Sequence, residues 1–259
     1  TESEELAIQI AEELENLNLE RRELTQTLIE EAKNRISDLD KKIIMVFGEE
    51  WSEGVVGLVA GKLQEEFFRP VLVASLSGDN ATGSARSIPS FNVTEALHQH
   101  ENLLERYGGH AQAAGFSIKK ENIEEFTNLM EKFAEENILD EDMVKEIIID
   151  SEIEGDDIIV ERIHEIDKLG PFGYKNKRPV FKIEDVVVRR KKIIGRDQNH
   201  VKLSVQKDTK IFDVLAFNKV EELAEIVEGQ QLDLVGSLRI NSWNGNNYIQ
   251  MNLIDFKNA

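Results

Sequence analysis

The chain has 259 residues, of which 41% are hydrophobic and none is cysteine, and its formal net charge is −19. This hydrophobic content predicts folded domains and excludes a disordered acidic tail. The lack of cysteine excludes disulfide scaffolds, thiolate zinc sites and cysteine nucleophiles. Apolar runs are far shorter than the roughly 20 residues of a membrane span, and the polar, acidic start predicts no signal peptide. We therefore expect a cytoplasmic protein, and, because no methionine comes first, part of a longer one.

Residues 2 to about 37 are predicted to form one long helix. Apolar residues recur there at alternating spacings of three and four positions, glutamate and basic residues fill much of the remainder, and neither glycine nor proline interrupts them. The apolar stripe is narrow and is broken at Arg21. Such a helix either pairs with a partner or spans between domains, and we expect residues 1–38 to be a helix that connects domains.

Residues 39–138 have the pattern of an α/β domain. Strands are expected over 42–47, 71–76, 81–87 and 116–118, and a glycine-rich stretch over 108–115 comes before the last of them. Helices are expected after Ser52, after Asn92 or Thr94 through Leu104, and over 121–136. Alternating strands and helices indicate a layered α/β fold.

Residues 139–259, including a linker, are predicted to be all-β. Short segments rich in valine and isoleucine suggest strands over 147–149, 180–183, 186–188, 200–205, 212–216, 232–238 and 248–253, with one helix near 220–227. Several strands with one late helix are typical of a small closed barrel of the OB type. A generic barrel or meander without a binding role stays open as an alternative.

Two segments of the α/β region contain candidate phosphate-binding residues. Gly108 and Gly109 would let a ligand approach the backbone, and His110 would donate to a phosphate oxygen. Ser84, Arg86 and Ser87 form the second segment, where strand alternation places Ser84 and Arg86 on one face. A glycine turn beside a surface histidine and an ordinary edge-strand arginine are the alternatives.

The barrel region carries cations and aromatic side chains of the kind that bind single-stranded nucleic acid. The candidate binding residues are Arg189, Arg190, Lys191, Lys192, Arg196, Lys202, Trp243 and Tyr248. Residues 179–259 hold 12 of the 31 basic and 11 of the 50 acidic side chains, so the acidity of the chain lies before them. A solvated loop and a hairpin tip are the alternative interpretation.

Catalytic groups are scarce. His98 and His100 are two positions apart, which on a helix would point their rings away from each other. We find no Walker loop, no nucleophile elbow and no metal-binding cluster of histidines and carboxylates. The sequence therefore predicts binding without a complete catalytic site, and we expect no metal site in this chain.

Six ordered motifs give the chain its resemblance to a known family. They are 51–57 (WSEGVVG), 69–73 (RPVLV), 83–89 (GSARSIP), 104–115 (LERYGGHAQAAG), 169–173 (LGPFG) and Trp243-Asn244-Gly245. Together they resemble the RecJ family of bacterial 5′→3′ exonucleases specific for single-stranded DNA, within the DHH phosphoesterase superfamily. The chain departs from the family pattern at Ser52, where histidine is frequent, and after Gly173, where Gly-Asn-Pro is frequent.

This resemblance implies the last three parts of such a protein: a connecting helix, a DHHA1 domain and an OB domain. It implies that Gly108, Gly109 and His110 face catalytic metals, that Arg86 with Ser84 and Ser87 contacts substrate phosphate, and that Trp243 lies along the DNA. It further implies a separate DHH catalytic domain with Mg²⁺ or Mn²⁺, and a role in DNA repair and recombination. Since two-metal hydrolysis needs those metals, we expect this chain alone to be inactive.

Two other functions stay open. The DHHA1 signature is shared with superfamily members that cleave dinucleotides or short oligoribonucleotides, although these need no groove for a strand. The leading helix and the acidic surface also suit an interaction module that docks a helicase or a single-strand-binding protein. Alanine substitutions over 189–192 would separate these interpretations, because they should abolish only strand binding.

Overall fold

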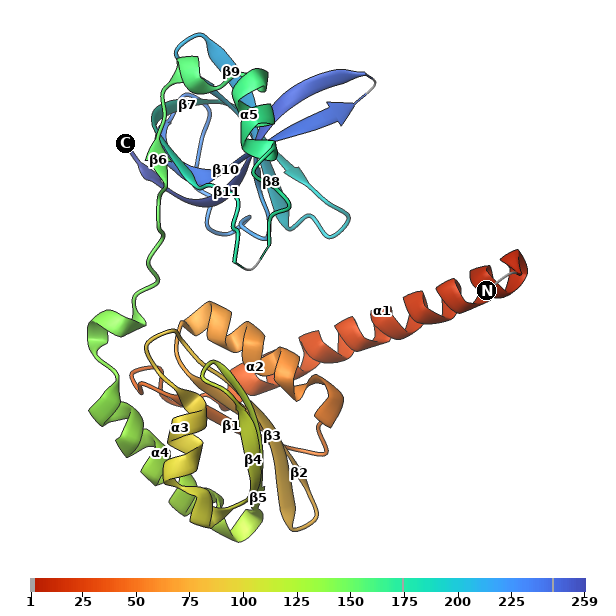
Figure 1. The fold of residues 1–259 in the computed structure, drawn as a ribbon, viewed down its shortest axis with the longest axis vertical. Helices are drawn as coiled ribbons and strands as arrows, with labels where there is room; N and C mark the ends of the chain where they lie inside the picture. The colour runs from red at the N-terminus through yellow and green to blue at the C-terminus, as the bar shows by residue number, and fades with distance from the viewer. Residues whose placement is uncertain (1–2, 174, 244) are drawn as a thin grey trace. The chain divides into compact units, whose positions relative to one another are not determined.

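The structure, a computed structural model, describes residues 3–173, 175–243 and 245–259 (Figure 1). The chain divides between Glu146 and Ile147 into two units, each with its own core. Residues 40–146 of the first unit form the α/β domain, and the second unit contains the barrel. Among the described residues, no helix combines the length and the apolar character that a membrane crossing requires.

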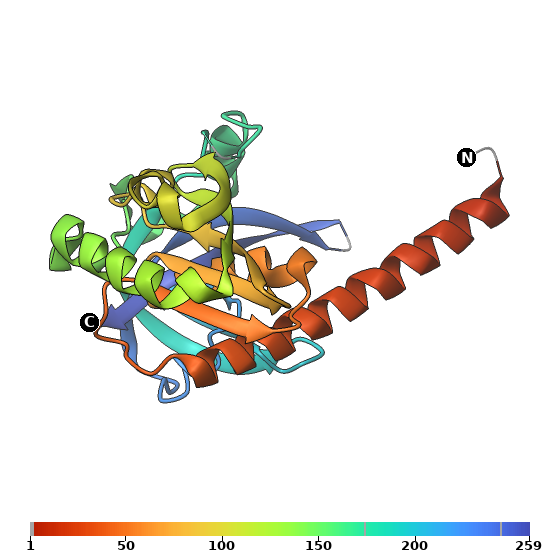
Figure 2. The same cartoon turned by 90° about the horizontal axis from the view of Figure 1, so that it is seen from below.

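Helix α1 (Glu4–Arg35) confirms the predicted long helix. The Ser3 side chain accepts a hydrogen bond from the Leu6 amide at its start. Only Leu28, Ile29 and Ala32, near its end, are buried, and there it packs on α2 (Glu53–Phe67) and β1 (Ile44–Glu49). The preceding turns extend beyond the α/β domain (Figure 2).

A five-stranded sheet in the order β1-β2-β3-β5-β4 forms the centre of the α/β domain. β2 (Val71–Ser77) runs parallel to β1, and β3 (Asn80–Arg86), β5 (Ala113–Lys119) and β4 (Leu104–His110) continue the sheet antiparallel. α2 covers one face near β2 and β3, whereas α3 (Val93–Gln99) and α4 (Ile123–Asn137) cover the other (Figure 1). Short 3₁₀ turns lie at Glu101–Leu103, Lys120–Asn122 and Asp140–Met143.

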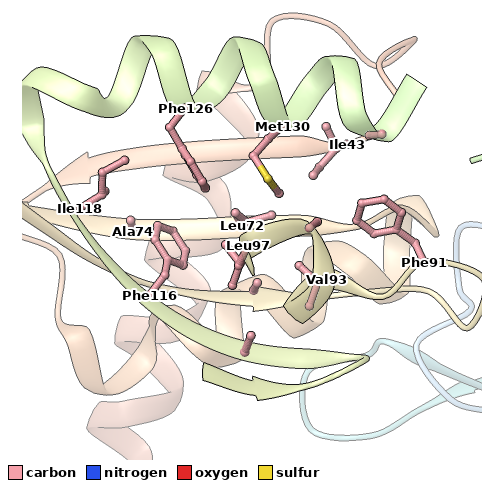
Figure 3. Packing of buried hydrophobic residues seen from close by; sticks show 14 of the residues in the cluster. Ile43, Leu72, Ala74, Phe91, Val93, Leu97, Phe116, Ile118, Phe126 and Met130 are labelled. Atoms are coloured by element: carbon pink, nitrogen blue, oxygen red, sulfur yellow. The ribbon is translucent and has the colours of Figure 1, made fainter. Parts of the chain in front are cut away.

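The larger core of this domain lies between the sheet and the α3–α4 layer. Phe126 and Met130 of α4 meet Leu72, Phe116 and Ile118 from the strands there (Figure 3). A second cluster between the sheet and α1–α2 includes Val71, Val73 and Trp51. Because α2 packs on β2 and β3 and does not reach β4, the α2 side of the sheet stays open at β4.

The expected elements of this domain need two corrections. α3 ends at Gln99, because the Leu103 amide bonds to the His100 carbonyl and Leu104 begins a strand paired with Ile118. The glycine-rich stretch over 108–115, expected to precede a strand over 116–118, forms the end of β4, the turn at Ala111-Gln112 and the start of β5. The β4–β5 hairpin, which pairs small residues, therefore takes the place of the last turn of the expected helix and of the glycine-rich stretch.

The second unit is a barrel. β7 (Phe181–Ile194), β8 (His200–Lys207), β9 (Lys210–Ala216), β11 (Asn246–Asn258) and β10 (Gln231–Trp243) follow one another, and β10 also pairs with β7 to close it. β6 (Ser151–Glu152) adds to β7, and a 3₁₀ turn (Gly155–Asp157) leads to α5 (Val160–Asp167). The barrel confirms the OB-type architecture expected from the sequence.

Several expected elements of this unit are wrong in detail. The segment 147–149 is not a strand, and 180–183 and 186–188 are one strand, β7, which continues through the basic run to Ile194. A bulge at Asp185, which has a φ of 53°, joins the two halves of β7. The helix expected near 220–227 is a series of turns, and α5 was not predicted.

Candidate nucleic-acid interface

Three rows of residues run across β3, β5 and β4 on the open side of the sheet. The register pairs Arg86 with Ala113 and Ala113 with His110, and it pairs Ser84 with Gly115 and Gly115 with Gly108. Thr82, Ser117 and Arg106 form the third row. Paired residues share a face, so Arg86 and His110 lie on one surface two strands apart, about 10 Å by strand spacing. We call these nine residues the sheet face.

The sheet face continues the surface under α2: its β3 residues lie at the edge of that helix and are half-buried, and its β4 residues are uncovered. Val71 and Val73 of β2, opposite Arg86 and Ser84, are buried in the cluster beneath α2. Farther along, Gly108, His110 and Gly115 are exposed. The sheet thus presents an arginine and a histidine on either side of a flat strip of small residues.

The two adjacent glycines of β4 serve different purposes. Gly109 has a φ of +153°, and a Cβ there would lie 2.3 Å from the Ala113 carbonyl oxygen, so the hairpin itself requires glycine. A Cβ at Gly108 would meet no atom within 4 Å. Glycine weakens a strand and often marks a place where a ligand approaches the backbone. The fold therefore gives no steric reason for glycine at position 108, whereas a ligand that approaches the backbone there would give one.

Arg86 is held in place without a carboxylate. Its Nη1 donates to the Ala85 carbonyl oxygen at 2.8 Å. On α2, a Cβ at Gly57 would lie 3.1 Å from Arg86 Nη2 and 3.2 Å from Ser84 Oγ, so the helix passes closely over both side chains. Within the described part of the chain, neither Arg86 nor His110 forms an ion pair. Their donors stay available to an anion such as phosphate.

Ser87 does not belong to the sheet face. It is buried, and its hydroxyl donates to the Phe91 carbonyl oxygen at 2.7 Å. Its amide donates to the Gln112 carbonyl oxygen, and Thr94 Oγ1 donates to the His110 carbonyl oxygen at 2.7 Å. Ser87 therefore fixes the β4–β5 turn, and the prediction that it binds phosphate gives way to a structural role.

On the barrel, alternation divides the basic run of β7 between two sides. Arg190 pairs with Ser204, and Lys192 pairs with Lys202. The residues between them on β8, Leu203 and Val201, are buried in the barrel. Arg190, Lys192, Lys202 and Ser204 therefore lie on the outer surface, and the same rows continue through β9 and β11 to Arg239 on β10. We call this surface, from Arg190 across to Arg239, the barrel face.

Three of the predicted cations are engaged in contacts within the barrel. Lys191 Nζ donates to the carbonyl oxygens of Leu223, Ala224 (2.8 Å) and Ile226 (3.1 Å), so it closes the turns that replace the expected helix. Lys202 forms an ion pair with Asp213 at 2.7 Å, and Arg189 Nε donates to Gln206 at 2.9 Å. Lys191 in particular does not face the barrel surface.

The other predicted residues lie in the β7–β8 loop and on the β10–β11 hairpin. Arg196 lies in the exposed loop between β7 and β8. Tyr248, opposite Asn241 on the β10–β11 hairpin, is 49% exposed. The ends of β10 and β11 extend beyond the barrel (Figure 1). The Trp243 side chain and Asn244, both named in the sequence prediction, lie outside what the structure describes.

Sequence reasoning missed three residues of these surfaces. Arg106 and Thr82 belong to the sheet face, and Arg239 belongs to the barrel face. Strict alternation along β3 and β10 would have indicated Thr82 and Arg239. Arg106 could not be placed that way, because a bulge between Leu104 and Arg106 shifts the register.

The described residues do not fit a metal ion. Across 3–173, 175–243 and 245–259, no group of three or more histidine or carboxylate side chains converges closely enough to bind one. The exposed Tyr107 hydroxyl, for example, donates to Glu101 and contacts His98, and this set contains only two potential metal ligands. What the two faces offer instead is hydrogen-bond donors, positive charge and open backbone.

Comparison with known proteins identifies two domain families in the chain. Residues 40–136 match the DHHA1 domain, and residues 149–255 match the RecJ OB domain. Over 253 residues the chain is 34% identical to the single-stranded-DNA-specific exonuclease RecJ of Bacillus subtilis, covering 96% of this chain and 32% of that protein. RecJ of Haemophilus influenzae is 28% identical over 263 residues, which cover 96% and 45% of the two proteins.

A solved structure has the same fold. The crystal structure of RecJ from Thermus thermophilus in complex with Mg²⁺ matches with a TM-score of 0.82 and 25% identity, covering 100% of this chain and 39% of that one. The chain therefore spans between 32% and 45% of the length of these relatives.

Proposed function

We propose a function for this chain from its family: the DHHA1 and RecJ OB domains show that the chain belongs to the RecJ family. On this premise, the chain binds and positions single-stranded DNA for exonuclease cleavage. The observation that carries this proposal is the pair of open, cationic surfaces, the sheet face and the barrel face. Each combines donors free of carboxylate partners with a route along which a strand can lie.

The sheet face suits a phosphate group. The Arg86 guanidinium offers two or more donors, the His110 ring offers one, and Gly108 lets the phosphodiester backbone lie against β4. The barrel face suits the sugar–phosphate backbone of a longer strand, with Arg190 and Lys192 free to contact phosphates. A dinucleotide would leave the barrel face without a function, which disfavours the short-oligonucleotide alternative.

Hydrolysis itself we assign to a separate DHH domain with a divalent metal, Mg²⁺ or Mn²⁺, acting 5′→3′ in DNA repair and recombination. The described residues of this chain do not fit such a metal. Its own part would be to hold the DNA end at the sheet face and the trailing strand at the barrel face. Docking of a single-strand-binding protein or a helicase is a further proposal, supported by the exposed apolar residues of α1.

Fluorescence anisotropy with 5′-phosphorylated single-stranded DNA tests this proposal. Arg86→Ala/His110→Ala and Arg190→Ala/Lys192→Ala should each weaken binding about ten-fold or more, since each removes two charge-assisted contacts. Lys191→Met is the matched control: it removes a cation of the same run whose contacts are internal. It should lower the melting temperature of the barrel and leave the affinity of the folded protein nearly unchanged. Equal affinities for the wild type and both double variants would contradict the proposal.

A further inference from the structure

A hollow of about 370 Å³ lies at one end of the barrel face, wholly within the second unit. Ile159, Val160 and Glu161, at the start of α5, form one wall, and Lys210 and Ile211 of β9 with Tyr248 of β11 form the other. Neither the domain pattern of the sequence nor the cationic rows of the barrel face account for it.

The hollow adjoins the barrel face. On β8 and β9 the outward rows run from Lys202 and Leu215 through Ser204 and Asp213 to Gln206 and Ile211. Ile211 therefore continues the outer surface that begins at Arg190 and Lys192. A strand lying across this surface toward the β10–β11 hairpin would reach the hollow.

The α5 wall is firmly attached to the barrel. A Cβ at Gly155 would lie 2.6 Å from Asp208 Oδ2 and 3.0 Å from the Lys207 carbonyl oxygen, so this backbone packs tightly on the β8–β9 turn. Lys207 also forms an ion pair with Glu154 at 3.1 Å. On either side of the wall, Ile158 and Ile163 are buried in the barrel core. The α5 wall of the hollow is therefore preformed, which lowers the cost of ordering on binding.

The side chains of the hollow combine exposed apolar surface with polar groups at its rim. Ile211 is 66% exposed and Tyr248 is 49% exposed, so the hollow offers apolar and aromatic surface that a ligand would cover on binding. Asn247 Oδ1 accepts a hydrogen bond from Ser242 Oγ at 2.7 Å, which holds this side chain against β10. Glu161 can accept a hydrogen bond, and Lys210 forms no ion pair within the described residues.

We infer that this hollow is a pocket for one unpaired nucleobase of a strand bound on the barrel face. The flat base would lie against Tyr248 and Ile211, its polar edge would meet Glu161, and Lys210 would contact the adjoining phosphate. This inference rests on the proposed function, because the strand must lie on the barrel face to deliver the base.

Scanning a strand for base contacts tests the inference. The probe is the shortest labelled oligothymidine that the chain binds with full affinity, so that the strand cannot shift its register. One nucleotide at a time is replaced by an abasic unit. At one position near an end of the contacted segment, loss of the base should weaken binding about five-fold or more, the usual loss for one stacked base.

Two variants connect that position with the pocket. Ile211→Ser removes apolar wall without changing charge; it should weaken binding of the intact strand by a similar factor and abolish the extra loss at the sensitive position. Val227→Ser is the matched control, since Val227 is 62% exposed on the same unit and is not part of the hollow.

The outcomes distinguish the two proposals. Strong binding with no sensitive position, or a sensitive position that Ile211→Ser leaves unchanged, overturns the nucleobase pocket and leaves strand binding standing. An absence of binding to any strand at low salt overturns both.

Discussion

At the scale of single residues, identical side chains have different reasons to be where they are. Gly109 is required by the hairpin, because its φ is +153° and its Cα hydrogens face the backbone of Ala113 and Ala114. Gly108, one position earlier, faces open space. Lys191 and Lys192 differ in the same way, since one closes an internal turn and the other lies on the surface.

The glycine pair gives a direct prediction. Gly109→Ala should lower the free energy of unfolding by about 2 kcal/mol or more, through its positive φ and its overlap with the Ala113 carbonyl. Gly108→Ala should leave stability nearly unchanged and weaken binding of single-stranded DNA by about 1.4 kcal/mol, or ten-fold. Thermal unfolding and anisotropy measure the two effects. Full affinity in Gly108→Ala would mean that no ligand approaches this backbone.

Asp233 gives a prediction for acid stability. The Asp233 carboxylate is buried, and it accepts a hydrogen bond from the Asp185 amide at 3.1 Å. This hydrogen bond, together with the ion pair to Lys257 at 3.2 Å, keeps the pKa of Asp233 below its usual value, although burial acts in the opposite direction. The pKa of Asp233 in the folded state lies below the unfolded value of about 3.9. Its contribution to folding stability is therefore present above about pH 3.9 and is lost as the pH falls through the folded pKa.

Urea unfolding between pH 3 and pH 7 measures this effect. The wild type should lose stability below about pH 4, and Asp233→Asn should be less stable at pH 7 and lose less on acidification. Asp197→Asn, in the exposed loop between β7 and β8, is the control and should follow the wild type. A pH dependence in Asp233→Asn identical to that of the wild type would count against the Asp185 contact.

At the scale of elements, the attachment of α1 depends on one glycine. Trp51 Nε1 donates to Glu31 of α1 at 2.9 Å, and Arg35 donates to the Phe47 carbonyl oxygen at 3.0 Å while lying over the Trp51 ring. A Cβ at Gly48 would lie 2.0 Å from that ring. The ring therefore occupies the space that any larger residue at position 48 would need.

Gly48→Ala should accordingly displace Trp51 and loosen α1. We expect a loss of about 1–3 kcal/mol of unfolding free energy, the usual cost of overpacking, and a red-shifted Trp51 emission in a Trp243→Phe background. Gly61→Ala is the opposite control: nothing lies within 4 Å of a Cβ there, in the interior of α2. It should stabilise the protein by about 0.5–1 kcal/mol. A stable Gly48→Ala with unchanged emission would show that the ring does not hold α1.

His100 connects α3 with α4 and gives this layer its own pH dependence. Burial lowers the pKa of His100, its Nε2 is buried without a hydrogen-bond partner in the described chain, and its ring meets Phe133 at 6.0 Å. Since the folded pKa lies below the unfolded value of about 6.5, stability should fall as the pH drops below that value. His100→Gln should remove this part of the pH dependence of the unfolding free energy, which is measured by Trp51 emission in the Trp243→Phe background. An unchanged pH dependence in His100→Gln would contradict this role of His100.

Elements with a strong period could be predicted from the sequence, and elements that depend on distant partners could not. α1, α2, α4 and most of the barrel strands follow from local spacing. β4 could not be foreseen, since its glycines and histidine become a strand only by pairing with Ala113, Ala114 and Gly115. The same holds for β7, where a bulge at Asp185 lets two short segments continue as one strand through the basic run.

Candidate site residues were predictable by type more than by role. Alternation correctly placed Ser84 and Arg86 together, and the register then brings His110 into the row of Arg86. The internal roles of Lys191 and Ser87 depend on the carbonyl groups of Leu223 and Phe91, which are placed by tertiary structure. Sequence alone could not show which members of a basic run are available to a ligand.

At the scale of the whole molecule, a protein with a net charge of −19 would have to bind single-stranded DNA, as proposed, through local positive charge. The open faces meet this need, since Arg86, Arg190 and Lys192 have no carboxylate partner within the described residues. Acidity elsewhere should repel duplex or strand that does not fit these faces. On the proposed function, we therefore expect strand selectivity and salt dependence to reflect the charges of both units.

The most direct test of the central claim is an anisotropy titration of the chain with single-stranded DNA and with the matched duplex over a series of salt concentrations. We predict selective binding of the single strand, with a logarithmic salt slope of about −0.7 for each phosphate neutralised. The magnitude of that slope should fall by about 1.4 in Arg190→Ala/Lys192→Ala. Equal affinity for the duplex, or a slope that the double variant leaves unchanged, would contradict a strand-positioning role.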